Sequence, residues 1–223
     1  MYNGIIRSAP MKSFLTVLIA LILILTCRAA RADSPITSTD FHTAYLDLAL
    51  VEKADANGVI DGEIAAYLCD SAHPIDIKAA ILNALGWKFE GKNNAELFSW
   101  YLAAKYGMRA AALNLDVLND GELFSLAYLT ALDDYFHPEK AVPLIDSAER
   151  RFALHAKTKP RGSFTVSLIR ALIHAQAAFD SDWCALWRLT EDAVDKSPLK
   201  RDMRPEAVTI ITEYMSLYRN DCR

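Results

Sequence analysis

The chain has 223 residues, of which 52% are hydrophobic and 23% are charged, with 24 Lys and Arg against 28 Asp and Glu. This apolar content is sufficient for a folded core and excludes an intrinsically disordered chain. The formal net charge is −4, and the acidic excess, which is larger in the predicted mature chain, argues against nucleic acid or an anionic membrane surface as the main partner.

The first part of the chain has the pattern of a cleavable export signal that starts at Met11. Lys12 supplies the positive charge, an unbroken apolar run covers 14–26, and a small–any–small triplet ends at Ala32. The run of about 13 residues is too short for a membrane span, which takes about 20. We therefore predict cleavage after Ala32, with residues 1–10 as an upstream extension.

Cleavage at this position predicts a signal peptide over 1–32 and a single mature domain over 33–223. Its removal deletes four basic residues and no acidic one, which leaves 20 against 28 and a formal charge of −8. The short signal is of the bacterial type, so we expect the mature protein in the periplasm or outside the cell, without a transmembrane segment.

Cys27 offers a second interpretation, because a lipoprotein signal also places a cysteine directly after the apolar run. Such a cysteine follows a small residue, whereas Thr26 precedes it here. The triplet at 30–32 is the better match, so a lipid anchor on Cys27 is disfavoured and remains the alternative.

Apolar residues recur at helical spacing throughout the mature chain, and the alternation typical of strands is rare. The connections are short, which favours antiparallel neighbours in sequence order. We predict an all-α fold of about nine stacked helices, either a helical-repeat-like array or a compact helical bundle. The expected helices span 40–55, 61–70, 75–86, 95–106, 121–135, 138–156, 163–179, 182–196 and 205–221.

Residue types typical of helix termini mark many of these boundaries. The first-turn prolines are Pro74, Pro138 and Pro205. The candidate capping residues are Asp61, Asn94, Asp120, Ser163 and Ser181, and the stop glycines are Gly58, Gly86 and Gly107.

The loop over 55–63 resembles an EF-hand calcium loop, with oxygen ligands at Asp55, Asn57 and Asp61. The same alignment places Lys53 at the first ligand position and Ile64 at the last. Those positions normally hold an Asp and a bidentate Glu, so too few hard oxygens remain for calcium. We favour a helix stop followed by a cap over a metal site, and predict no cofactor.

Two segments resemble single units of helical-repeat families. Residues 64–87 are similar to one HEAT unit, with a helix, an Asp-x-x-x-Pro turn and a second helix that carries alanines and a Leu-Gly end. Residues 127–150 are similar to part of a tetratricopeptide pair, with Pro138 at the turn. These resemblances imply stacked helical hairpins and, by analogy, a surface that binds a protein or peptide.

The expected helix over 163–179 is apolar around most of its circumference. Its polar residues Ser167, Arg170 and His174 form one narrow stripe. Arg170 and His174 are candidate binding residues for an anionic group, although a solvated edge of a mostly buried helix is the favoured interpretation.

The last two expected helices carry aromatic pairs at i, i+4 spacing, Trp183 with Trp187 and Tyr214 with Tyr218. Tryptophan and tyrosine are typical anchors of interfaces, so Trp183 and Trp187 are candidate binding residues. Packing within the final hairpin is the favoured interpretation, with an exposed edge as the alternative.

Three cysteines remain in the predicted mature chain. Cys184 begins one helix of the final hairpin and Cys222 ends the other, so antiparallel packing places both at the same end. We predict a Cys184–Cys222 disulfide, which leaves Cys69 as a buried free thiol.

No catalytic motif is present. The five histidines are scattered and none neighbours a Ser or Cys in a recognised signature. Asp133, Asp134, His137 and Glu139 cluster around a helix end but lack the histidine pair of metallohydrolases. A capped junction between helices explains this cluster better than a metal site.

The function expected from the sequence is that of an exported, non-catalytic helical protein that binds a protein or peptide in the cell envelope. An acidic inhibitor of a basic protein is one form of this class. One alternative is a lipid or small-molecule carrier with a pocket lined by helix 163–179. Another is a hydrolase of envelope polymers that uses Glu96 or Glu122, each of which opens a helix in a repeated Glu-Leu-Phe-Ser segment.

Overall fold

The computed structural model describes residues 34–86, 93–157 and 159–222, and the chain divides into two compact units, Met1–Asp33 and Ser34–Arg223. The predictions for Met11, the 1–32 signal peptide and Cys27 lie outside the described residues. Within the described ranges the fold is all-α, as predicted: it has nine α-helices and five 3₁₀ helices, and no strand. None of these helices is long and apolar enough to cross a membrane.

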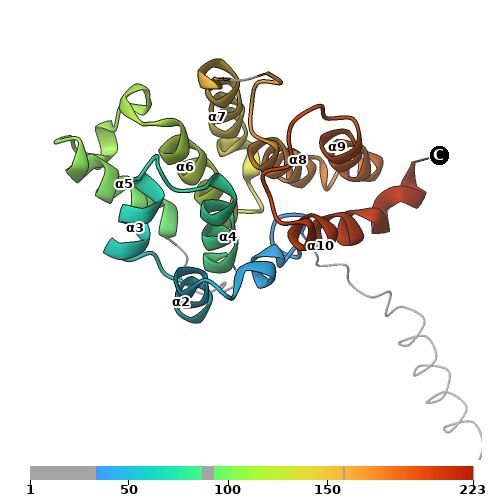
Figure 1. Ribbon diagram of the computed structural model, residues 1–223, viewed down its shortest axis with the longest axis horizontal. Helices are drawn as coiled ribbons and strands as arrows, with labels where there is room; N and C mark the ends of the chain where they lie inside the picture. The colour runs from blue at the N-terminus through green and yellow to red at the C-terminus, as the bar shows by residue number, and fades with distance from the viewer. Residues whose placement is uncertain (1–33, 87–92, 158, 223) are drawn as a thin grey trace, which may run out of the picture. The chain divides into compact units, whose positions relative to one another are not determined.

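The helices follow one another with short connections (Figure 1). The α-helices are α2 (Ala49–Asn57), α3 (Gly62–Cys69), α4 (Ile75–Leu85), α5 (Asn94–Lys105), α6 (Asp120–Asp133), α7 (Val142–His155), α8 (Phe164–Ala178), α9 (Trp183–Asp195) and α10 (Pro205–Met215). The 3₁₀ helices are η1 (Phe41–Tyr45), η2 (Ala110–Ala112), η3 (Leu115–Val117), η4 (Pro138–Lys140) and η5 (Ser216–Asp221).

The prediction of one continuous helix over 40–55 is wrong, because the chain breaks between η1 and α2. The Arg204 guanidinium donates to the backbone oxygen of Ala44 at 2.8 Å and lies 4.4 Å from the centre of the Tyr45 ring. Leu48 adopts an extended conformation, and α2 starts after it. A contact from the far end of the chain therefore holds the carbonyl that a longer helix would use.

Two other predicted helices change type along their length. The segment 138–156 begins as η4 and becomes α-helical only at Val142, where Pro143 lies in the first turn of α7. The segment 205–221 is α-helical to Met215 and continues as η5, consistent with the tightening common at helix ends.

The predicted caps Asp61 and Ser163 are confirmed. Asp61 accepts bonds from the backbone amides of Glu63 and Ile64, and Ser163 accepts one from Val166. Gly58 and Gly107 have φ of 67° and 66° at helix ends, in the left-handed region that favours glycine.

Three predicted caps are wrong by one position or by role. Asn119, not Asp120, caps α6 in a reciprocal capping box with Glu122, and Asp182, not Ser181, caps α9. Asn94 lies inside the first turn of α5, and its side chain binds the backbone of the turn that precedes α3.

Gly86 is the C-cap of α4, as predicted, but its φ of −69° lies outside the left-handed region. A Cβ at this position would lie 2.7 Å from a methyl group of Leu132 on α6. The missing side chain therefore serves close packing of the α4 end against α6.

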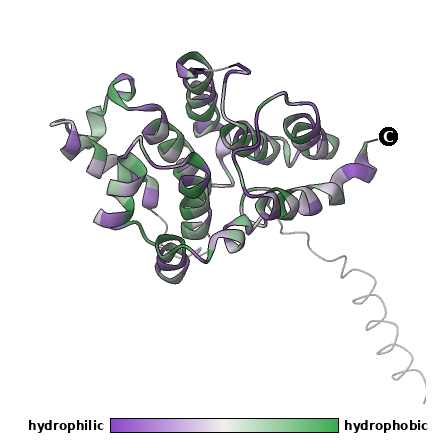
Figure 2. Ribbon diagram, in the orientation of Figure 1, coloured by the Kyte–Doolittle hydropathy of each residue, from purple (hydrophilic) through white to green (hydrophobic). Residues whose placement is uncertain are grey.

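Helix α4 is the centre of the packing, and its residues from Lys78 to Leu85 are all buried. It contacts η1, α2, α6 and α8, and much of it is coloured as hydrophobic in Figure 2. Two polar residues of α4 are buried among these neighbours, Lys78 and Asn83. The Asn83 amide oxygen accepts bonds from the His42 backbone and ring, and its nitrogen donates to Thr39 and Tyr128.

Neighbouring helices from α5 to α9 pack on one another in sequence order, as expected for stacked hairpins. The segment 127–150 forms such a hairpin, because α6 and α7 pack extensively around the turn at η4. In the segment 64–87, of which Trp87 lies outside the described residues, α4 packs mainly against α2 and η1 and makes few contacts with α3. Contacts of α4 with α8, and of η1 with α10, join elements that an array with only neighbour contacts would keep apart.

The described chain begins in the core. Ser34 and Ile36 are buried, and the Ser34 hydroxyl donates to the side-chain oxygen of Gln176 on α8. The first described residues are thus held by tertiary contacts as soon as the second unit begins.

Candidate functional site

A cavity of about 660 Å³ opens between three segments of the second unit. They are the α3–α4 turn with the first turn of α4, the connection from η3 to the start of α6, and the last turn of α7. The volume lies within the usual range for ligand sites, roughly 300–1,000 Å³. Both charged and apolar side chains line it, so this cavity is the candidate functional site.

Lys78 on α4 is the most unusual residue of the cavity wall, because its side chain is a buried cation with 2% of its surface exposed. Its ammonium group donates to the backbone oxygens of Leu68 at 2.9 Å and Asp70 at 2.7 Å, at the end of α3. A cation is favourable at a helix C-terminus, so Lys78 caps the C-terminal end of α3. Burial lowers its pKa from the ordinary value.

Gly121 provides the space for that ammonium group. A Cβ on Gly121, in the first turn of α6, would lie 2.8 Å from Nζ of Lys78. Alanine is the better helix former by about 1 kcal/mol, so glycine here trades helix propensity for the close approach of the lysine. Both residues line the cavity.

Two ion pairs lie around the opening of the cavity. Arg151 of α7 donates to the backbone oxygens of Leu118 and Leu115, at 2.8 and 3.1 Å, and lies 3.5 Å from the carboxylate of Asp116. His155, one turn further on, lies 2.8 Å from the Asp120 carboxylate. Each carboxylate of the opening therefore already has a partner.

The rest of the wall is apolar or aromatic. Ile75, Leu118 and Phe152 line it, and Leu154 stands at its edge with 70% of its surface exposed. His73 also lines it, with its ring stacked on Tyr67 at 3.8 Å between centroids. The wall of the cavity thus combines apolar and aromatic side chains with the charged groups of its opening.

A buried polar network lies behind the cavity, around Glu122. Its carboxylate accepts bonds from Lys105 at 2.5 Å, the Tyr106 hydroxyl at 2.7 Å and the Asn119 amide at 2.8 Å. Burial opposes its ionisation, but these bonds outweigh burial and hold its pKa below the ordinary value. Glu122 is thus a structural carboxylate with its oxygens occupied, whereas Glu96, the other predicted acid–base candidate, is exposed on α5.

Cys69 is the free, buried thiol, as predicted. Burial, together with the nearby Glu122 carboxylate, raises its pKa from 9.0 to about 12. The thiol stays protonated at neutral pH, which does not suit a nucleophile.

Arg170 and His174 do project from one side of α8, but toward α7 and not into the cavity. The Asp146 carboxylate accepts from Arg170 at 2.6 Å and lies 2.8 Å from the His174 ring, and Arg170 also pairs with Glu149 at 3.1 Å. Burial opposes ionisation of Asp146, but the bonds to His174 and Arg170 hold its pKa below the ordinary value. These residues form an ion-pair network that joins the two helices.

The aromatic residues near the C-terminus form one cluster. Trp183 stacks on Phe179 with 5.6 Å between ring centroids and meets the edge of Tyr218 at 5.8 Å. Trp183 keeps 38% of its surface exposed, whereas Trp187 is partly buried beneath the guanidinium of Arg219, at 5.5 Å. Packing between α9 and η5 accounts for most of this cluster, with an exposed edge at Trp183.

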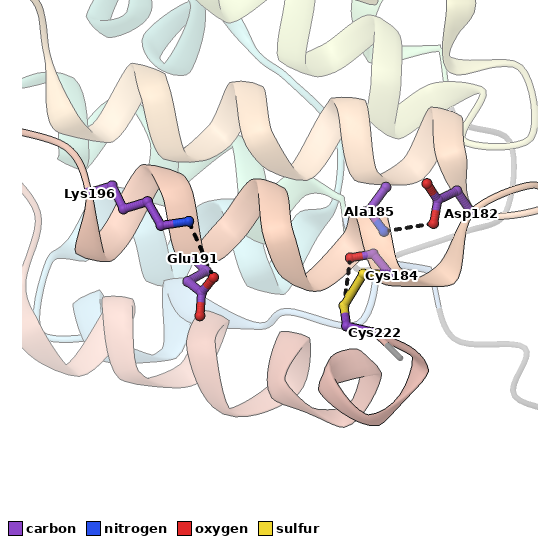
Figure 3. The surroundings of a disulfide bond; sticks show 6 residues. All are labelled: Asp182, Cys184, Ala185, Glu191, Lys196 and Cys222. Carbon is purple, nitrogen blue, oxygen red and sulfur yellow. Dashed lines mark hydrogen bonds and ion pairs between the residues drawn. A yellow bond between two sulfur atoms is a disulfide. The ribbon is translucent and has the colours of Figure 1, made fainter.

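The predicted disulfide is present, between Cys184 at the start of α9 and Cys222 just after η5 (Figure 3). Their Cα atoms are 4.7 Å apart. The figure also shows Asp182 capping α9 beside the disulfide. The covalent bond holds the end of the chain against α9.

The EF-hand-like loop is occupied by its own side chains. Lys53 lies 2.6 Å from the Asp61 carboxylate and 2.5 Å from that of Glu63, while Asp61 also caps α3. Asp55 lies 3.2 Å from the His42 ring, and Asn57 is the last residue of α2. The lysine thus occupies the place where a cation would bind.

The cluster around His137 forms a helix junction. Asp134 pairs with His137 at 2.9 Å and with Lys140 at 3.5 Å, and Asp133 accepts from the Ala95 amide at 2.7 Å. Across the described ranges, no group of three or more His, Cys, Asp or Glu residues has an arrangement that could hold a metal ion.

Fold and site together define a class: an all-α, disulfide-bonded domain with a cavity of mixed charge. No protein-family model, no curated protein and no solved structure matches the chain.

Sequence reasoning missed the cavity residues Lys78, Gly121, Asp120, Arg151 and His155 as a group. One signal was present, because Lys78 is a cation within the otherwise mostly apolar stretch 75–85. The remaining residues are ordinary surface types, and only the meeting of α4, α6 and α7 brings them together.

Proposed function

We propose that this chain is an exported, non-catalytic helical protein that binds a segment of a protein partner in the cavity between α4, α6 and α7. One observation carries this proposal: a buried cation, Lys78, forms part of the wall of a cavity large enough for a ligand. Buried charges are costly and are usually retained where they have a role in structure or binding.

The composition of the wall favours a peptide segment as the occupant. Apolar side chains at Ile75, Leu118 and Phe152 can receive an apolar side chain, while charged groups of both signs can bind the polar main chain. A lipid carrier would need a dry, apolar pocket, whereas the apolar residues of α8 pack in the core.

The arrangement supports binding more than hydrolysis. In the described part of the chain, no serine or cysteine hydrogen-bonds the His155–Asp120 pair of the cavity, so this pair has no nucleophile to activate. Glu122, the buried candidate acid, has its carboxylate oxygens occupied.

Export is the second part of the proposal, and two features support it. The chain divides into units after Asp33, one residue beyond the predicted cleavage after Ala32. The Cys184–Cys222 disulfide is typical of an oxidising compartment such as the periplasm or the extracellular space.

Site-specific photocrosslinking tests the binding role. A photoreactive amino acid placed at Leu154, which is 70% exposed at the cavity edge, should crosslink to one protein at a single contiguous segment. The matched control is the same substitution at Leu217, which is 52% exposed in η5 and does not line the cavity. Equal crosslinking at both positions, or a retained small apolar molecule in native mass spectrometry, would exclude the proposed role.

A further inference from the structure

We infer that the cavity anchors its occupant through a carboxylate group bound by the Lys78 ammonium. This inference rests on the proposed function and names the chemical group that the cavity recognises. The carboxylate is either the C-terminus of the partner or the side chain of one of its Asp or Glu residues.

The Lys78 ammonium group uses two of its hydrogen-bond donors within the protein. An ammonium has three donors, and two of them meet the backbone oxygens of Leu68 and Asp70. Within the described ranges, no carboxylate forms an ion pair with Lys78. Lys78 therefore has one donor left, and the Asp70 and Glu122 carboxylates act on its charge only at longer range.

The Lys78 side chain lies beside the open space of the cavity. Gly121 lacks the side chain that would lie 2.8 Å from Nζ, and both residues line the cavity. The backbone at Gly121 belongs to the first turn of α6, whose helix dipole places positive charge at the same wall. A carboxylate in the cavity would meet the ammonium and the positive end of the helix together.

The carboxylates near the cavity are the groups that would repel a bound anion. Asp120 is paired with His155, and Asp116 with Arg151. Two further carboxylates act on Lys78, those of Asp70 and Glu122. Asp70 lies 3.5 Å from His73, with 52% of its side-chain surface exposed to solvent, and Glu122 is paired with Lys105 at 2.5 Å. Each of these acidic groups has its own partner, and among the described residues none of them forms an ion pair with Lys78.

Part of the cavity wall that contains Lys78 is apolar. Ile75, Leu118, Phe152 and Leu154 line the same cavity as Lys78. A peptide that ends in an apolar residue offers a carboxylate and an apolar side chain on adjacent atoms, and this combination matches the wall.

Nuclear magnetic resonance titration of the exported, purified protein tests the inference, with the Gly121 amide as reporter. The probes are N-acetyl-alanyl-leucine as the free acid, the same dipeptide as the C-terminal amide, and N-acetyl-glutamyl-leucinamide. We expect at least one carboxylate probe to bind about tenfold more tightly than the dipeptide amide, because a charge-assisted bond is made only by the carboxylate. The stronger of the two carboxylate probes identifies the source.

Three variants make the test specific. Lys78→Met should bring the affinities for carboxylate and amide probes to within about twofold, and Gly121→Ala should weaken carboxylate binding, because its Cβ displaces the ammonium. Lys140→Met, at an exposed position outside the cavity, removes the same charge and should leave the preference unchanged.

Affinities of both carboxylate probes equal to that of the dipeptide amide, no perturbation of Gly121 by any probe, or an unchanged preference in Lys78→Met overturns the inference. None of these outcomes affects the crosslink at Leu154, so failure of the carboxylate anchor is distinguishable from failure of the proposed function.

Discussion

Removal of the Cys184–Cys222 disulfide is the prediction whose size follows most directly from the structure. The two cysteines are separated by 38 positions, and in the chain-entropy treatment a closed loop of that length stabilises the folded state by roughly 4 kcal/mol at 25 °C. Replacing both cysteines by serine should lower the free energy of unfolding by about that amount. For a domain of this size the melting temperature should fall by about 8–16 °C.

Urea unfolding and calorimetry of three samples measure this effect: the oxidised protein, the reduced protein and the double-serine variant. The reduced protein and the variant should agree within about 1 kcal/mol, and reductant should not affect the variant further. Because Tyr218 contacts Trp183 beside the disulfide, tryptophan fluorescence should also change before global unfolding. A loss below about 1 kcal/mol, or a non-reducing peptide map with Cys69 in the disulfide, would refute the reasoning.

Three further predictions concern groups that are buried or partly buried. The pKa of Cys69 is raised from 9.0 to about 12, so its contribution to stability is complete below pH 9 and is lost as the pH rises toward 12. Urea unfolding at pH 10 should therefore show a loss of about 1.4 kcal/mol that Cys69→Ala lacks. Asn83→Leu should cost about 3 kcal/mol in the same assay, because it removes the acceptor that the His42 backbone amide and ring Nδ1 share; a cost below about 1 kcal/mol would contradict this. The lowered pKa of Asp146 gives stability above its ordinary pKa of 3.8 that is lost as the pH falls. Asp146→Ala should thus cost about 1 kcal/mol at pH 7 and less at pH 3, and an equal cost at both would argue against the Arg170 pair.

Local patterns in the sequence were sufficient for the fold class, the disulfide and most helix positions. Helical periodicity predicted α3 to α9 because most of these helices bury one side against their neighbours, whereas α4 and α6 are buried around most of their circumference. The predicted caps of α6 and α9 were wrong, because two polar residues adjoin at the start of each helix. Asn119 with Asp120, and Ser181 with Asp182, are pairs in which either residue type can cap, and only backbone geometry selects one.

Long-range contacts account for what the sequence could not predict. The break between η1 and α2 depends on Arg204, about 160 positions away from Ala44. Gly86 was predicted only as a helix stop, and no role was predicted for Gly121, yet each accommodates a side chain from another helix. The candidate site was missed for the same reason, because Lys78 becomes informative only beside Gly121 and the end of α7.

The burial of Ser34 and Ile36 constrains when the proposed cleavage after Ala32 can take place. A protease that cleaves at the proposed site after Ala32 has to bind an extended chain on both sides of the bond. The chain is already buried at Ser34. The proposed cut must therefore be made while this segment is still detached from α8, or during its transient opening. Cleavage by the peptidase would then compete with docking of the segment around Ser34 against α8. A variant that folds faster would accumulate as uncut precursor.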